Sequence, residues 1–130
     1  MKKQTILSVL ILMISFNSFS QRATIDGDTA KYKDQVYYVG KVVNLLYGSS
    51  NDKSFGFVYV GSGIGGGAKM QSNWSKYPVR IDKIYKTSGT VYFRGIALNE
   101  KGNNAIPMNK VFVDITGAVD NKEIAEEIQK

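Results

Sequence analysis

The side chains that most often perform chemistry in proteins are scarce in this sequence. It contains neither histidine nor cysteine, so the commonest general base, the commonest transition-metal ligand and the thiolate nucleophile are all missing. We therefore expect no metal site and no cofactor. Asp82 and Asp114 are the only carboxylates inside predicted strands, and both alternate with apolar neighbours, which indicates charges that face solvent. An enzyme that uses this carboxylate pair is the least favoured hypothesis, and we assign no catalytic residue.

A glycine-rich string, Gly61 to Gly67, follows a predicted strand and matches the spacing of the dinucleotide-binding fingerprint. That fingerprint works by presenting a pyrophosphate to the N-terminus of a helix in a βαβ unit. The residues that follow, 68–75, have no sustained apolar period of a helix, and no βαβ pattern comes later. We therefore do not predict nucleotide binding.

The segment from Gly61 to Tyr77 is more informative as a loop. It exceeds about 12–15 residues, the length beyond which irregular loops in compact domains are uncommon and tend to be functional or disordered. It contains the only tryptophan of the chain, Trp74, and aromatic faces beside cations can stack on sugars or bases and pair with anionic groups. The candidate ligand-binding residues are the aromatic and basic side chains in and just after this loop: Lys69, Trp74, Lys76, Tyr77 and Arg80. The alternative is that Trp74 packs back as a lid over one end of the fold.

The elements that would position these residues are strands. Five segments have the composition and alternation of β-strands: 36–47, 55–60, 79–86, 90–98 and 110–116. The second is expected to run antiparallel to the first, with a bend at Gly40 in the first strand. Thr87-Ser88-Gly89 predicts a tight hairpin with its glycine in the left-handed conformation. A slip in the apolar phase around Asp82 and Lys83 predicts either a bulge or a strand buried on both sides at that end. Strand tyrosines that face outward would extend a binding surface.

The C-terminal residues 121–129 are the only segment with a helical pattern. Asp120 is expected to cap this helix, with Glu123 completing a capping box and Val119 and Ile124 closing a hydrophobic staple. Hairpin-like connections followed by one helix predict a mainly β fold. We expect a small antiparallel five-stranded barrel or closed sheet with the C-terminal α-helix over one open end.

The predicted architecture resembles the five-stranded oligonucleotide/oligosaccharide-binding barrel. The resemblance is one of strand number and closure, without a sequence motif. That barrel places its helix between the third and fourth strands, whereas this chain has only Thr87-Ser88-Gly89 at that point.

The first residues, 1–20, have the pattern of a cleaved signal peptide. Lys2 and Lys3 provide its positive start, Ile6 to Phe16 its apolar run, and Ser20 a small residue at the expected cleavage site. We therefore predict export to the periplasm or the extracellular space, with no stable membrane insertion after cleavage. Loss of the two lysines lowers the formal charge from +6 to +4, an excess that solubility explains as well as an anionic partner does.

The remainder of the chain is predicted to hold one domain. Residues 21–35 contain few apolar side chains and are expected to form a mobile N-terminal segment. Residues 36–130 form the single barrel-like domain, which must be stable without disulfides.

Three functional hypotheses follow. The first is an exported, non-enzymatic binding or interaction module that uses the loop 61–77, with an anionic or saccharide ligand or an envelope protein as partner. The second is a structural accessory subunit of a cell-envelope assembly, which would use an exposed sheet edge or the segment 21–35. The third is the carboxylate-dependent enzyme. The sequence does not predict the identity of the ligand.

Overall fold

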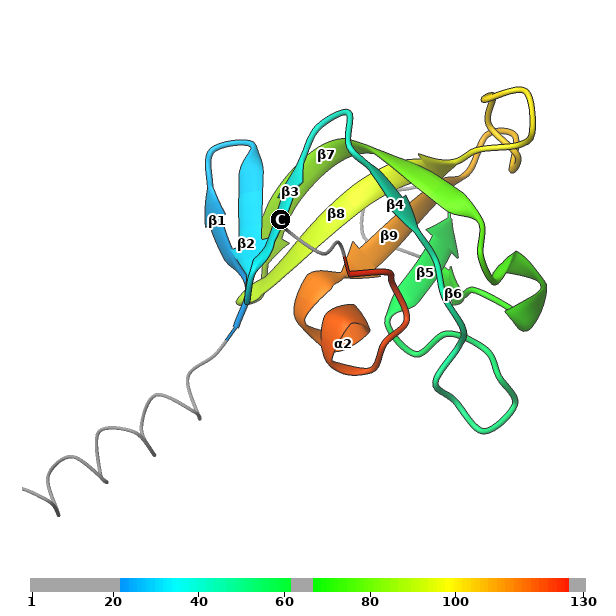
Figure 1. Cartoon of the computed structure of the whole chain (residues 1–130), viewed down its shortest axis with the longest axis horizontal. Coiled ribbons are helices and arrows are strands. Elements are labelled where there is room, and N and C mark those ends of the chain that lie inside the picture. The colour runs from blue at the N-terminus through cyan, green and yellow to red at the C-terminus, as the bar shows by residue number, and fades with distance from the viewer. Residues whose placement is uncertain (1–21, 62–66, 127–130) are drawn as a thin grey trace, which may run out of the picture.

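The computed structural model describes residues 22–61 and 67–126, which build two antiparallel sheets (Figure 1). The predicted signal peptide, residues 1–20, lies outside the described residues. The smaller sheet has the order β1-β2-β3 and comprises β1 (Thr24–Asp26), β2 (Thr29–Tyr32) and β3 (Gln35–Tyr38). In the described ranges, no helix has both the length and the apolar character needed to cross a membrane.

The larger sheet has six strands in the order β4-β7-β8-β9-β5-β6. They are β4 (Val42–Asn44), β5 (Val58–Gly61), β6 (Ala68–Lys69), β7 (Pro78–Thr87), β8 (Thr90–Ala97) and β9 (Lys110–Asp114). β4 and β6 are its two ends and do not pair with each other, so the expected closed barrel is not found in the part of the chain that the structure describes. The fold is mainly β with open antiparallel sheets.

The β7–β8 hairpin confirms the sequence prediction. Thr87 pairs with Thr90 across a two-residue turn, and both Ser88 (φ 51°) and Gly89 (φ 80°) are left-handed, as the tight turns that match strand twist require. The register shifts between Ile81 and Lys83, which is the predicted bulge at Asp82. These two strands are the longest of the larger sheet and lie side by side in it, between β4 and β9 (Figure 1).

The expected first strand, 36–47, is divided between the two sheets. Its first part is β3, its second part is β4, and the chain turns between them at Gly40, whose φ is 97°. Because β3 pairs with β2 and β4 pairs with β7, neither pairs with β5. The expected pairing of the first two strands is therefore wrong, and β5 lies instead between β9 and β6.

Regular structure is present within the segment 21–35, which was expected to be mobile. Residues 24–32 form the β1–β2 hairpin around Gly27, whose φ is 61°. Ala30 and Tyr32, two positions apart on one face of β2, are both buried in the core. A few apolar side chains at the period of a strand are sufficient to dock this hairpin.

The helix is the largest error of the sequence prediction. The observed helix, α2, spans Ile115–Asp120, and its N-cap is Asp114, whose side chain accepts a hydrogen bond from the Gly117 N–H. Residues 121–126, expected to be helical, form a turn and an extended segment, and 127–129 lie outside the described residues. Asp120 ends the helix instead of capping it. The reason is that Glu123 satisfies backbone groups elsewhere in the chain.

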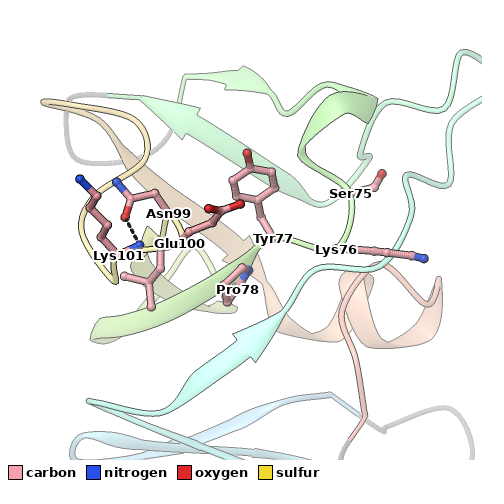
Figure 2. Close-up of a pocket in the computed structure, with 8 residues that line it drawn as sticks. Ser75, Lys76, Tyr77, Pro78, Asn99, Glu100 and Lys101 are labelled. Carbon is pink, nitrogen blue, oxygen red and sulfur yellow. Dashed lines mark hydrogen bonds between the residues drawn. The ribbon is translucent and has the colours of Figure 1, made fainter.

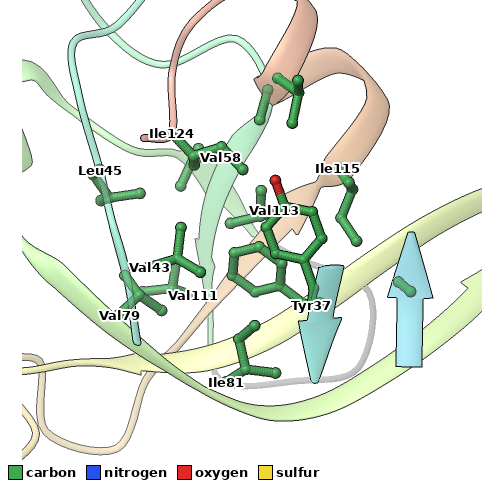
Figure 3. Packing of buried hydrophobic residues seen from close by; sticks show 14 of the residues in the cluster. Tyr37, Val43, Leu45, Val58, Val79, Ile81, Val111, Val113, Ile115 and Ile124 are labelled. Atoms are coloured by element: carbon green, nitrogen blue, oxygen red, sulfur yellow. The ribbon is translucent and has the colours of Figure 1, made fainter. Parts of the chain in front are cut away.

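The core lies between the two sheets and α2 (Figure 3). Tyr37 of β3 projects into it and stacks on Phe93 of β8, with ring centroids 5.8 Å apart. The C-terminal segment closes one side, since Ile124 is fully buried and forms an isolated bridge with Leu45. The chain after α2 therefore covers the outer edge of β4.

Candidate functional site

An open pocket lies where β7 begins and β8 ends, and we take it as the candidate functional site. Its volume is about 800 Å³. Two segments line it, one before and one after the hairpin: Ser75, Lys76, Tyr77 and Pro78, and Leu98, Asn99, Glu100 and Lys101. In Figure 2, the Glu100 carboxylate points toward Tyr77 in the middle of this group, whereas Lys76 extends away from it.

The Tyr77 ring is held by its own segment and by β4. A 3-10 helix, η1 (Ser72–Trp74), precedes it, and Trp74 packs against Tyr77 with ring centroids 4.6 Å apart at 66°. The carbonyl oxygen of Tyr77 accepts a hydrogen bond of 2.8 Å from the Leu45 N–H, and the Lys76 N–H donates one of 3.2 Å to the Leu46 carbonyl. These bonds continue the β4–β7 pairing beyond β4, so the aromatic ring is presented by a fixed backbone.

The opposite wall is a turn that Asn99 holds together. Its side-chain oxygen accepts hydrogen bonds from the N–H groups of Lys101 and Asn103, each 3.0 Å long. The Leu98 N–H donates to the Pro78 carbonyl at 2.9 Å, which ties this turn to the Tyr77 segment. The exposed side chains of Glu100 and Lys101 stand on it. The pocket lining thus combines a half-buried aromatic ring with one carboxylate, that of Glu100, and the ammonium groups of Lys76 and Lys101.

The five candidate residues from the sequence are only partly brought together. Lys76 and Tyr77 line the pocket, and Trp74, half-buried against the core, supports Tyr77 from behind. Lys69 lies on β6 and Arg80 on β7 opposite Val42, and neither lines the pocket. The lid hypothesis for Trp74 agrees with this packing better than direct ligand contact does.

The wall formed by residues 98–101 was missed in the sequence, although a usable signal was present. The predicted hairpin pairs Thr87 with Thr90, and counting outward past the predicted bulge pairs Val79 with Ala97. The residues just beyond that pair, Pro78 and Leu98, must then be neighbours. The register of the hairpin therefore brings the turn after β8 beside the end of the loop 61–77.

The carboxylates considered for catalysis have separate partners. Asp82 accepts from Arg94 Nε at 2.8 Å and from Lys110 Nζ at 2.9 Å; burial acts to raise its pKa, but these two hydrogen bonds lower the pKa below its usual value. Asp114 caps α2, and burial raises its pKa against the opposing effect of hydrogen bonds from Thr116 and Gly117. Both carboxylates have structural contacts that account for their positions.

Several strand tyrosines do face outward, on the side of the large sheet away from the core. Tyr85 of β7 and Tyr92 of β8 are cross-strand partners and stack with centroids 5.5 Å apart. Tyr59 of β5 donates a hydrogen bond to the Gly56 carbonyl. This face is distinct from the residues that line the pocket.

Glu123 is a buried carboxylate whose role in the structure is to anchor a loop. Its carboxylate is fully buried and accepts hydrogen bonds from the backbone N–H groups of Ser49, Gly56 and Phe57 at 2.9, 2.7 and 2.8 Å, and from the Ser49 hydroxyl at 2.6 Å. Donors of this kind compensate for the cost of burying a charge. Glu123 therefore fixes the loop 48–57 against the C-terminal segment.

Comparison of the chain with protein-family models, with curated proteins and with solved structures found no match. Across the residues that the structure describes, no group of three or more acidic side chains is placed to hold a metal ion. The pocket's own geometry is therefore the basis for assigning a function.

Proposed function

We propose that this protein is an exported binding module and that the pocket around Tyr77 takes a saccharide. The observation that carries the proposal is the presentation of the Tyr77 ring, braced by Trp74, opposite the polar turn 98–101. A sugar ring has an apolar face of C–H groups that packs on an aromatic ring, and hydroxyl groups at its edge that donate and accept hydrogen bonds. Glu100, Asn99 and the Tyr77 hydroxyl supply polar groups of both kinds.

The charge of this pocket favours a polyhydroxylated ligand over an anion. Glu100 and Lys101 contribute opposite charges to its wall. Lys76, the other cation of the segment, places its Nζ 5.5 Å from the centroid of the Tyr47 ring, on the far side of the segment from Glu100. In Figure 2 Lys101 also extends away from Tyr77, so the charged group that points toward the ring is the Glu100 carboxylate, which disfavours an anion there. Export, which the pattern of residues 1–20 predicts, would expose the pocket to extracytoplasmic glycans.

Fluorescence of Trp74 tests this function, because Trp74 is the only tryptophan and contacts Tyr77. The protein is titrated with soluble dextran, laminarin and galactomannan. We expect at least one polysaccharide to change the emission, and Tyr77→Ala to weaken that binding about tenfold, equivalent to about 1.4 kcal/mol of lost stacking. The binding should be confirmed by calorimetry, since the substitution also changes the surroundings of Trp74.

Tyr38→Ala is the matched control, since Tyr38 is a half-exposed tyrosine on β3 and does not line the pocket. It should bind like the wild type. Absence of binding to all three polysaccharides, or equal affinities for the wild type and Tyr77→Ala, would refute the saccharide pocket.

The hypothesis of an envelope accessory subunit is supported by a different surface. Tyr38, Val39 and Val42 surround the turn between β3 and β4 and are 50%, 48% and 44% exposed. Adjacent exposed apolar side chains favour contact with another protein. Cross-linking in the native envelope from a photoreactive residue at position 39 would test this second candidate, which predicts a discrete protein adduct.

A further inference from the structure

A second pocket lies on the other side of the segment 72–76 from the Tyr77 ring. It has a volume of about 460 Å³ and is lined by Tyr47, Gly48, Lys53, Ser72 and Ser75. Ser75 also lines the first pocket, so the two hollows are separated by a single stretch of chain. A ligand longer than one sugar unit is able to reach from one to the other.

The wall of this second pocket is a tightly folded loop. Gly48 has no space for a Cβ atom, which would collide with the carbonyl oxygen of Lys53. Lys53 itself has a left-handed backbone with φ of 66°, and its N–H donates to the Ser50 carbonyl at 2.9 Å. Glu123 holds the other end of the same loop through Ser49 and Gly56. The loop thus keeps the Lys53 side chain beside Tyr47.

The second pocket is electropositive. Lys53 lines it together with hydroxyl-bearing side chains, and no carboxylate is among its lining residues. Lys76 lies beside it, and a hydrogen bond with Tyr47 raises the pKa of Lys76 above its usual value. The nearest acidic neighbour in sequence, Asp52, accepts hydrogen bonds from the Ser54 N–H at 3.1 Å and hydroxyl at 2.6 Å. Lys53 and the Ser72 hydroxyl therefore line the hollow, with the Lys76 ammonium group beside it, whereas the Ser75 hydroxyl already donates to the Ser72 carbonyl at 2.7 Å.

We propose that the second pocket binds an anionic substituent of the same glycan that occupies the first, so that the ligand is an acidic polysaccharide. Lys53 and Lys76 would pair with a carboxylate or sulfate group, and the Ser72 hydroxyl would donate a hydrogen bond to one of its oxygens. The neutral sugar ring lies on Tyr77 across the Ser75 boundary. This inference rests on the proposed saccharide function and specifies the class of ligand.

Three polymers with one backbone separate the contributions of the two pockets: dextran, carboxymethyl-dextran and dextran sulfate of equal chain length. Binding is measured by calorimetry at about 50 mM and about 150 mM salt, because exposed charges are screened as ionic strength rises. We expect at least one anionic polymer to bind ten or more times more tightly than dextran. A gain with carboxymethyl-dextran alone identifies a carboxylate ligand, and a gain with dextran sulfate alone identifies a sulfate ligand.

The variants Lys53→Gln and Lys76→Gln test the site, and Lys86→Gln is the control. Lys86 is an exposed lysine near the opposite end of β7 from the pockets, so Lys86→Gln removes the same charge as either single variant but elsewhere. The proposal predicts that Lys53→Gln and Lys76→Gln each lose part of the anionic preference, that the double variant loses most of it, and that Lys86→Gln keeps it. Equal losses in Lys86→Gln and in each single variant would show nonspecific attraction and overturn the second pocket.

The outcomes separate this inference from the proposed function. If dextran and its anionic derivatives bind equally and all depend on Tyr77, the second pocket is refuted while the saccharide pocket stands. If anionic polymers depend on Lys53 and Lys76 but not on Tyr77, the two pockets do not share one ligand and the proposal is refuted. Dependence on both sites in the same polymer supports it.

Discussion

Replacing the buried Glu123 with alanine should destabilise the fold more than replacing any exposed residue of the C-terminal segment. The substitution removes the acceptor for four hydrogen bonds and leaves the donors of Ser49, Gly56 and Phe57 without it. Hydrogen bonds to charged groups contribute about 1.5–3 kcal/mol each, which sets an upper limit of about 6–12 kcal/mol. Burying the carboxylate costs several kcal/mol in the wild type, so the expected net loss is about 3–5 kcal/mol.

Urea unfolding followed by far-UV circular dichroism measures this loss as a lower midpoint at unchanged slope. Glu126→Ala is the control, since Glu126 is an exposed glutamate three residues after Glu123. This substitution should change the free energy of unfolding by no more than about 0.5 kcal/mol. Glu123→Gln should fall between the two, because an amide keeps one oxygen but turns N–H donors toward the donors of the loop. If Glu123→Ala unfolds at the same urea concentration as Glu126→Ala, the anchoring of the loop 48–57 is wrong.

Three further predictions concern the helix, the small sheet and export. Asp114→Ala should lose about 0.5–2 kcal/mol of stability to urea, because the cap of α2 is removed. Asp114→Asn should lose nothing at pH 7, because the amide oxygen still caps the helix and the carboxylate that it replaces has a pKa raised by burial. Equal losses of stability in the two variants would contradict this. Tyr32→Phe should cost about 1–2 kcal/mol by removing the 2.8 Å hydrogen bond to Asp120. Burial, together with the hydrogen bond to Asp120 and the charge of Asp120, raises the pKa of Tyr32 from 10.0 to about 12. The neutral form of Tyr32 therefore stabilises the wild type below pH 10, and this contribution disappears by about pH 12. If the stabilities of the wild type and Tyr32→Phe differ by the same amount across that pH range, this contribution is excluded. Protein recovered from its native host should begin at Gln21, and an intact mass that includes residues 1–20 would disprove cleavage.

The β7–β8–β9 part of the fold could be predicted because its determinants are local. Alternating apolar residues select the strands, and Ser88-Gly89 selects a turn with two left-handed residues. The bulge at Asp82 was visible as a slip in that alternation. Each of these features depends on residues a few positions apart, and pairing between adjacent strands follows directly from the hairpin.

The N-terminal hairpin is not evident from composition, because residues 21–35 contain few apolar side chains; only the spacing of those few indicates a strand. Ala30 and Tyr32 are two positions apart, as one face of a strand requires, and Gly27 with its acidic neighbours has the composition of a turn. The pairing of β5 was missed for another reason. β5 joins β9, some fifty residues further along the chain, and no local pattern specifies a partner at that separation.

Glu123 shows how a local pattern and a distant contact can compete for the same side chain. Three residues after Asp120, it has the spacing of a capping box, which would satisfy N–H groups of a helix starting there. The loop 48–57 offers three backbone N–H groups and a hydroxyl in one place, more donors than a helix start presents to that position. The carboxylate therefore binds the loop 48–57, and the chain after α2 extends along β4. Gly48 and Lys53 of that loop line the second pocket. Glu123 thus positions the wall of the second pocket. If that pocket binds an anion, Glu123→Ala should weaken anionic binding even at temperatures where the variant remains folded.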